Sequence, residues 1–266
     1  MVQQIVAAKD GAGPKEIRIS ARHFGDKLEQ ARQAGLEGVE IGVGEPAETL
    51  QIAKPAFRQK IKHQMKATGL KASSLSMDLL NGCPVATDER AAAWVLQAIE
   101  AAGDLGAAGI LVPFFGKADL LKGKKLKPDV VGALVGRMKE LAPVAKKAGV
   151  MLGLENTCSA EQNIRIIERI GSEAVGCYYD IGNSTYGGYD VPAEIRLLKD
   201  RLCLIHFKDG GHYLGEGKVR MQPVAEALKA IKYDGWIVLE TACPSNSAVA
   251  DCKRNGEFIR KLMGSA

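Results

Sequence analysis

The chain of 266 residues has few aromatic residues and no long apolar run. Aromatics make up only 5% of the sequence, and no stretch approaches the roughly 18 consecutive apolar residues of a membrane-spanning helix. The first residues lack a basic start, an apolar stretch and a small-residue cleavage site, so no signal peptide is visible. We therefore expect a cytoplasmic protein without a membrane partner.

The cysteines lack the spacing of a metal or redox motif. Six are present, and none forms a C-x-x-C pair. Several lie inside apolar runs, where a cysteine usually serves as a small core residue. We interpret all six as reduced structural thiols: Cys83, Cys158, Cys177, Cys203, Cys243 and Cys252.

Charge of one sign is not concentrated in any region. The formal net charge is +5, and the densest basic run, residues 120–128, has lysines but no aromatic side chain. A nucleic-acid surface requires a basic stripe, usually with aromatic residues between the charges. We therefore expect no nucleic-acid partner, although a few cations beside a pocket would suit a small anionic substrate.

Short apolar runs alternate regularly with longer amphipathic segments. The runs that we expect to form strands are residues 16–20, 38–42, 70–76, 108–113, 150–155, 175–180, 202–207 and 236–240. The segments between them have helical periodicity, and most end in a glycine suited to a left-handed C-cap. These glycines are Gly35, Gly69, Gly149, Gly171 and Gly235.

This alternation predicts an α/β fold. Apolar strands joined by helices are typical of a parallel sheet that is covered on both faces. Eight such units in about 250 residues indicate a (β/α)8 TIM barrel, here a single domain over residues 1–266, with residues 1–15 forming a strand or lid. The motif at residues 42–47 resembles a dinucleotide fingerprint, but Glu45 would repel the pyrophosphate, which argues against a doubly wound sheet.

Polar residues end the last four predicted strands in succession. Glu155, Asp180, His206 and Glu240 each lie at the C-terminal end of one strand. In a barrel these ends meet at one rim, where active sites of this fold lie. Three carboxylates and one imidazole predict one divalent ion, with Mn²⁺, Mg²⁺ or Co²⁺ favoured over Zn²⁺.

Several segments carry a family resemblance: GLEGVEI (35–41), GLENT (153–157), YDIGN (179–183), HFKDG (206–210), GEGKV (215–219) and YDGWIVLE (233–240). Through them the chain resembles the xylose isomerase-like TIM-barrel superfamily of sugar and sugar-phosphate isomerases and epimerases. The resemblance implies that Glu155, Asp180, His206 and Glu240 hold the metal, and that Glu155 and Glu240 also act as the catalytic acid/base pair. It further implies a homo-oligomer.

The hypothesis is proton transfer next to the carbonyl of a small sugar or polyol ketone. One glutamate would remove a proton to give a cis-enediolate, and the other would return one. Two alternatives stay open on the same barrel: an inosose-dehydratase-like lyase and a non-catalytic sugar-binding protein. A three-zinc endonuclease of this superfamily is disfavoured because the chain has only four histidines.

Substrate contacts are expected from residues around the rim. Lys208 should share the face of His206, where it could contact the substrate or pair with a carboxylate. Asn183 occupies a position where related ketohexose 3-epimerases usually have histidine, and its amide could bind a sugar hydroxyl.

Three further residues have two interpretations each. Glu40 could reach the pocket or pair with a basic neighbour. His212 lies in the loop after the seventh predicted strand, and could recognise a phosphate or hydroxyl or simply be solvated. Phe115 could stack on the apolar face of a sugar or pack in the core.

Overall fold

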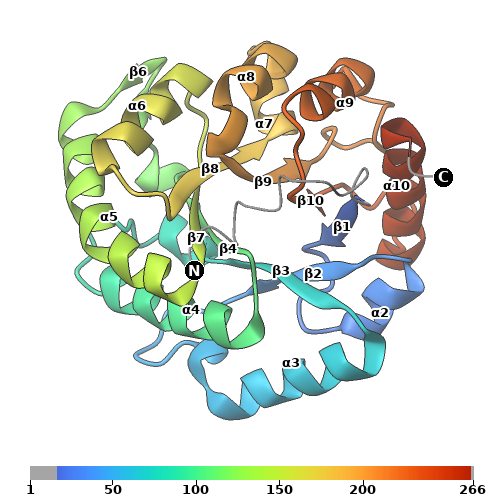
Figure 1. The fold of residues 1–266 in the computed structure, drawn as a ribbon, viewed down its shortest axis with the longest axis horizontal. Coiled ribbons are helices and arrows are strands. Elements are labelled where there is room, and N and C mark those ends of the chain that lie inside the picture. Colours follow the sequence, from blue (N-terminus) through green and yellow to red (C-terminus); the bar gives the residue numbers. More distant parts are fainter. Residues whose placement is uncertain (1–16, 265–266) are drawn as a thin grey trace.

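A computed structural model describes residues 17–264, which form a closed barrel of parallel strands surrounded by helices (Figure 1). Around the barrel each strand pairs with the next barrel strand along the chain, so that β4 pairs with β7, and β1 pairs with β10 to close the ring. The barrel strands are β1 (Arg18–Ala21), β2 (Gly38–Gly42), β3 (Lys71–Ser76), β4 (Gly109–Pro113), β7 (Met151–Glu155), β8 (Val175–Asp180), β9 (Leu202–Phe207) and β10 (Trp236–Leu239).

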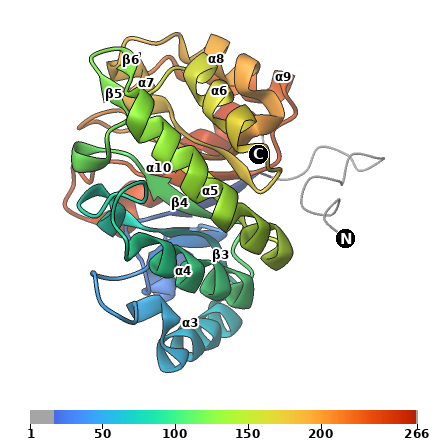
Figure 2. The same cartoon turned by 90° about the vertical axis from the view of Figure 1, so that its left-hand side faces the viewer.

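The helices cover the outside, and Figure 2 shows α3, α4 and α5 side by side along one flank. They are α2 (Leu28–Gln33), α3 (Pro55–Thr68), α4 (Ala91–Leu105), α5 (Pro128–Ala148), α6 (Ala160–Ile170), α7 (Ile181–Tyr186), α8 (Val191–Leu198), α9 (Met221–Ala230) and α10 (Ala248–Met263). Short 3-10 turns are η1 (Gln51–Ala53), η2 (Asp78–Asn81), η3 (Gly116–Ala118) and η4 (Lys199–Arg201), and β5 (Leu121–Lys122) and β6 (Lys125–Leu126) form a small hairpin.

The predicted TIM barrel is confirmed, with every predicted strand in place and its ends shifted by at most two residues. The strand or lid expected at residues 1–15 lies outside the described residues. No helix in the described range 17–264 is long and apolar enough to cross a bilayer. The cysteines are free thiols, as expected.

The glycine caps are confirmed at most positions. Gly69, Gly149 and Gly171 end α3, α5 and α6 in the left-handed conformation, which only glycine adopts without strain. The prediction for Gly235 is wrong: α9 ends earlier, and the left-handed residue there is Lys232, with φ of 54°. The sequence pattern predicted the start of β10 at Trp236 but not the turn at Lys232 that precedes it.

Large side chains fill the barrel interior against glycines. Leu204 and Trp236 belong to one buried apolar cluster inside the barrel. A Cβ on Gly38 would lie 2.7 Å from the carbonyl oxygen of Lys71 and 2.9 Å from the Trp236 ring. A Cβ on Gly109 would lie 2.8 Å from Leu204. The close packing of side chains inside the barrel therefore requires glycine at positions 38 and 109.

Gly38→Ala is expected to destabilise the protein by about 1–3 kcal/mol, because backbone and an indole ring both block the added methyl group. The matched control is Gly132→Ala on α5, where no atom lies within 4 Å of the new Cβ and the helix gains a better helix former. Urea unfolding of the two variants measures the difference. Equal midpoints for Gly38→Ala and the parent protein would contradict the packing account.

Candidate metal centre

The four residues at the ends of the last strands lie together. Glu155 is the last residue of β7, Asp180 the last of β8, and Glu240 follows β10 directly. His206 lies near the end of β9, in register with Asp180 on β8. Parallel pairing thus brings groups separated by up to 85 positions in the printed sequence to one end of the barrel.

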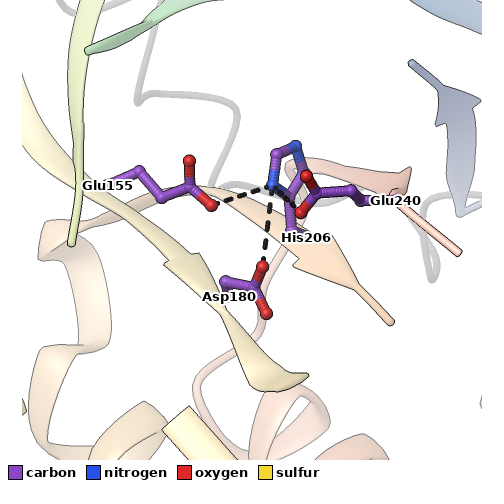
Figure 3. Close-up of side chains that lie close together, drawn as sticks. All are labelled: Glu155, Asp180, His206 and Glu240. Carbon is purple, nitrogen blue, oxygen red and sulfur yellow. Dashed lines mark hydrogen bonds and ion pairs between the residues drawn. The ribbon is translucent and has the colours of Figure 1, made fainter. Parts of the chain in front are cut away.

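The side chains converge on one nitrogen of the imidazole (Figure 3). His206 Nδ1 lies 3.2 Å from Glu155 Oε1, 3.2 Å from Glu240 Oε2 and 3.9 Å from Asp180 Oδ2. Figure 3 shows Glu155 and Glu240 approaching the ring from opposite sides. His206 is fully buried, and only Glu240 is partly accessible.

The other imidazole nitrogen faces Glu40. Its Nε2 lies 3.4 Å from Glu40 Oε1, and both side chains are fully buried. Glu40 Oε2 accepts hydrogen bonds of 2.7 Å from the hydroxyls of Ser74 and Tyr178. Glu40 therefore lies behind His206 in the barrel interior as an ion-pair partner, and a carboxylate behind a histidine is typical of metal sites.

Two cations flank Glu240. Lys208 Nζ lies 2.9 Å from Glu240 Oε2 and 2.8 Å from Asp180 Oδ2. Arg22, directly after β1, donates to Glu240 Oε1 at 2.5 Å and to Asp78 Oδ2 at 2.6 Å. Its Nε also lies 3.8 Å from Glu40 Oε1. Arg22 was missed by the sequence analysis, because a basic residue after a strand resembles a solvated strand end.

Burial and charge shift the proton affinities of the cluster in opposite directions. Burial raises the pKa of Asp180 to about 7, although Lys208 opposes the shift, and burial also raises the pKa of Glu155. For Glu240, burial is outweighed by His206, Lys208 and Arg22, which lower its pKa. Burial would lower the pKa of His206, but Glu40 and Glu155 raise it well above its usual value.

The donor set fits one divalent ion. One ligand atom from each of Glu155, Asp180, His206 and Glu240 lies within 4.8 Å of the others. Metal–ligand bonds of about 2.0–2.2 Å place opposite ligands roughly 4.0–4.4 Å apart, close to this spread. Carboxylate oxygens with one imidazole nitrogen suit hard or borderline ions. Because Nε2 faces Glu40, the lone pair of His206 can lie on Nδ1, toward the three carboxylates.

The remaining predicted substrate residues differ in their relation to this cluster. Asp180 is the N-cap of α7, and its Oδ1 accepts a hydrogen bond of 2.8 Å from the backbone N–H of Asn183. Phe115 follows β4, is partly buried, and donates its backbone N–H to Asn81. His212 is exposed on the loop after β9. Lys208 contacts two of the carboxylates through its side chain, at Asp180 Oδ2 and Glu240 Oε2.

Asp209 shapes the loop after β9. It is completely buried, and its carboxylate accepts backbone N–H groups from Gly215, Gly217 and Val219 at 2.9–3.1 Å. A side chain at Gly217 would collide with this carboxylate. The GEGKV segment (215–219) thus folds around the Asp209 carboxylate, and these hydrogen bonds hold the loop that follows Lys208.

The sequence profile of the family described as "xylose isomerase-like TIM barrel" matches residues 28–262. The chain belongs to this family. Its barrel resembles the solved structures of an L-ribulose 3-epimerase (TM-score 0.77, 20% identity, 94% of this chain and 95% of that chain) and a D-psicose 3-epimerase (TM-score 0.77, 15% identity, 93% and 100%). At sequence identities of 15–20%, this structural similarity establishes the fold alone.

The curated proteins that match this chain in sequence share only 26–27% identity with it. Escherichia coli SgbU, provisionally named an L-ribulose-5-phosphate 3-epimerase, is 26% identical over 239 residues, which cover 81% of this chain and 82% of SgbU. An inosose dehydratase of Geobacillus kaustophilus is 27% identical over 132 residues, covering 40% of this chain and only 42% of the dehydratase. An uncharacterised protein of Methanocaldococcus jannaschii is matched over 47% of its length.

Glu40→Gln is expected to weaken Mn²⁺ binding about 10- to 100-fold, because the amide keeps the hydrogen bonds from Ser74 and Tyr178 but loses the charge behind His206. Titration calorimetry with Mn²⁺ measures the change. Glu168→Gln, which removes a charge from a surface ion pair with Arg201, serves as the control and should bind Mn²⁺ like the parent. Unchanged affinity in Glu40→Gln would show that the carboxylate does not support the imidazole.

Mn²⁺ affinity is expected to fall about tenfold between pH 8 and pH 6, because Asp180 has a pKa raised to about 7 and must lose its proton before it binds an ion. The sign follows from the raised pKa: the neutral acid is favoured below pH 7 and competes with the ion. Calorimetry in two buffers of different ionisation heat would count the released protons. The same affinity at both pH values would contradict this account.

Proposed function

We propose that this protein is a divalent-metal-dependent isomerase or epimerase of a small sugar or sugar phosphate. Family membership and the epimerase-like barrel support the reaction class. The observation that carries the proposal is the placement of Glu155 and Glu240 on opposite sides of His206 (Figure 3), with one oxygen of each 3.2 Å from Nδ1. Two carboxylates that face each other across a site can address both faces of one carbon atom.

The two glutamates would act as a proton-transfer pair. One carboxylate removes the proton from the carbon next to a carbonyl, which leaves a cis-enediolate. The other delivers a proton, either to the opposite face of the same carbon, which gives an epimer, or to the neighbouring carbon, which gives an isomer. Groups positioned for acid/base chemistry contribute typically 10²–10⁴-fold in rate.

Glu155, Asp180, His206 and Glu240 would hold the ion, with Mn²⁺, Mg²⁺ or Co²⁺ preferred and Zn²⁺ also compatible. Once bound, the ion would supply electrostatic stabilisation of the negative charge that develops on the substrate oxygens. The chain would contribute the rest: Glu40 would orient His206, while His206, Lys208 and Arg22 lower the pKa of Glu240 and so favour its ionised form.

Substrate recognition would come from the rim. Lys208 is placed to donate to a substrate oxygen beside Glu240, and Asn183 lies one helical turn after Asp180, where its amide can meet a hydroxyl. Phe115 follows β4 on a neighbouring loop, and exposed His212 would meet the outer end of a longer or phosphorylated sugar. Glu40 would act indirectly, through His206.

Glu155→Gln and Glu240→Gln are each expected to reduce turnover by 10²-fold or more, since each amide cannot accept or deliver the transferred proton. The assay follows hydrogen exchange from D₂O into ketoses, inososes and their phosphates by proton NMR, with Mn²⁺-loaded protein. Glu161→Gln on the exposed face of α6 is the matched control and should retain full exchange. Parent-level exchange in either site variant would refute the two-glutamate mechanism.

The product distinguishes the related reactions. Exchange with inversion supports an epimerase, and exchange with carbonyl migration an isomerase. Loss of water would instead assign the inosose-dehydratase-like lyase, for which the partial match to the Geobacillus enzyme is the supporting observation. Metal binding and sugar binding without exchange of any carbon-bound proton would indicate a non-catalytic sugar-binding barrel.

A further inference from the structure

Lys208 occupies the oxygens that a metal ion would need. Its ammonium lies 2.8 Å from Asp180 Oδ2 and 2.9 Å from Glu240 Oε2. These are the same two oxygens that face His206 Nδ1, at 3.9 Å and 3.2 Å. The Lys208 ammonium thus bridges two of the four potential metal ligands, Asp180 and Glu240.

The other nearby cation is placed differently. Arg22 contacts Glu240 through the opposite oxygen, Oε1, and reaches away to Asp78. It can therefore stay in position while Oε2 binds an ion. Apart from the imidazole of His206, Lys208 is the one described side chain that forms ion pairs with both Asp180 Oδ2 and Glu240 Oε2.

The inner part of the Lys208 side chain is packed, and only its outer part can move. Lys208 directly follows β9, and its Cγ packs against Gly182, where an added Cβ would lie only 2.4 Å away. A lysine side chain has a compact charge on four rotatable carbons, so its ammonium can move several ångströms while the backbone stays fixed. About a quarter of the side chain is already exposed, so a route to solvent is open.

We propose that Lys208 is a displaceable counter-cation: it neutralises Asp180 and Glu240 in the metal-free protein, and a divalent ion displaces its ammonium from both oxygens. The inference rests on the proposed metal site. An ammonium and a divalent ion on the same pair of oxygens repel each other strongly at this depth, because a buried site screens charge poorly. Once displaced, the ammonium becomes a free donor beside the site for an oxygen of the substrate.

Removing the ammonium should therefore strengthen metal binding. Lys208→Met, which keeps an unbranched stem, is expected to bind Mn²⁺ at least about tenfold more tightly than the parent in calorimetry with Mn²⁺ alone. Without metal, Lys208→Met should unfold at a lower temperature than the parent, and added Mn²⁺ should raise its Tm by more. Lys208→Arg retains a cation and should gain no affinity.

Lys146→Met is the matched control. It removes an ammonium from an exposed ion pair with Glu173, at the end of α5 remote from the strand ends that bear the cluster, and should leave Mn²⁺ affinity unchanged. Crystal structures of the parent with and without Mn²⁺ give a second, variant-free test. The ammonium should leave hydrogen-bonding distance of both Asp180 Oδ2 and Glu240 Oε2 when Mn²⁺ is bound.

The outcomes separate this inference from the proposed function. If the parent binds Mn²⁺ but Lys208→Met binds it equally or less tightly, or if the ammonium stays on both oxygens in the Mn²⁺ structure, Lys208 supports the ligands and the displacement is wrong. If the parent binds no divalent ion at all, the metal site fails and the inference fails with it.

Discussion

The concentration of negative charge at one end of the barrel is the constraint on which the rest of the structure depends. Glu40, Glu155, Asp180 and Glu240 lie within one cluster, and the first three are almost completely buried. Ionised carboxylates at such depth require compensation, because burial penalises the charged form. His206 lies between them as the central partner, and two cations complete the balance at the rim. In the barrel interior, the hydroxyls of Ser74 and Tyr178 donate hydrogen bonds to one oxygen of Glu40. The interior is therefore polar toward the site and apolar where Leu204 and Trp236 fill it.

This arrangement follows from the barrel itself. Parallel strands bring every C-terminal end to one rim, so a polar residue at the end of each successive strand is enough to assemble a cluster. The depth of each group then determines its role. Glu40 lies midway along β2 and meets the far side of the imidazole, whereas Glu240 follows the end of β10 and remains partly accessible. The buried carboxylate orients the ring and the accessible one can meet a substrate. Asp209, one residue beyond Lys208, fixes the adjoining loop with three backbone hydrogen bonds, so the rim is rigid where the cluster is exposed.

The sequence predicted the strands and the four-residue cluster because both depend on local patterns: apolar runs mark buried parallel strands, and a potential metal ligand lies at the end of each of the last four runs. What it could not predict depends on three-dimensional neighbours. Arg22 was missed because its partners Asp78 and Glu240 lie 56 and 218 positions away. Glu40 could be placed near a strand end, but its contact with His206 depends on the barrel register. Gly235 was assigned to a helix cap because glycine before a strand usually ends a helix, whereas here the helix ended earlier and Lys232 made the turn. Lys208 was expected to meet either a substrate or a carboxylate, and its ion pairs with Asp180 and Glu240 match the second expectation.

The pair formed by Arg22 and Glu240 lies where the ring of strands closes. Arg22 follows β1 and Glu240 follows β10, and these strands pair from Arg18 with Trp236 to Ala21 with Leu239. Glu240 therefore receives its guanidinium partner only when the first and last strands have met, at the largest sequence separation in the barrel. Contacts of such separation carry the highest loop-closure cost and form late in folding. Until the ring of strands has closed, Glu240 would therefore lack its guanidinium partner and could pair only with Lys208 and His206.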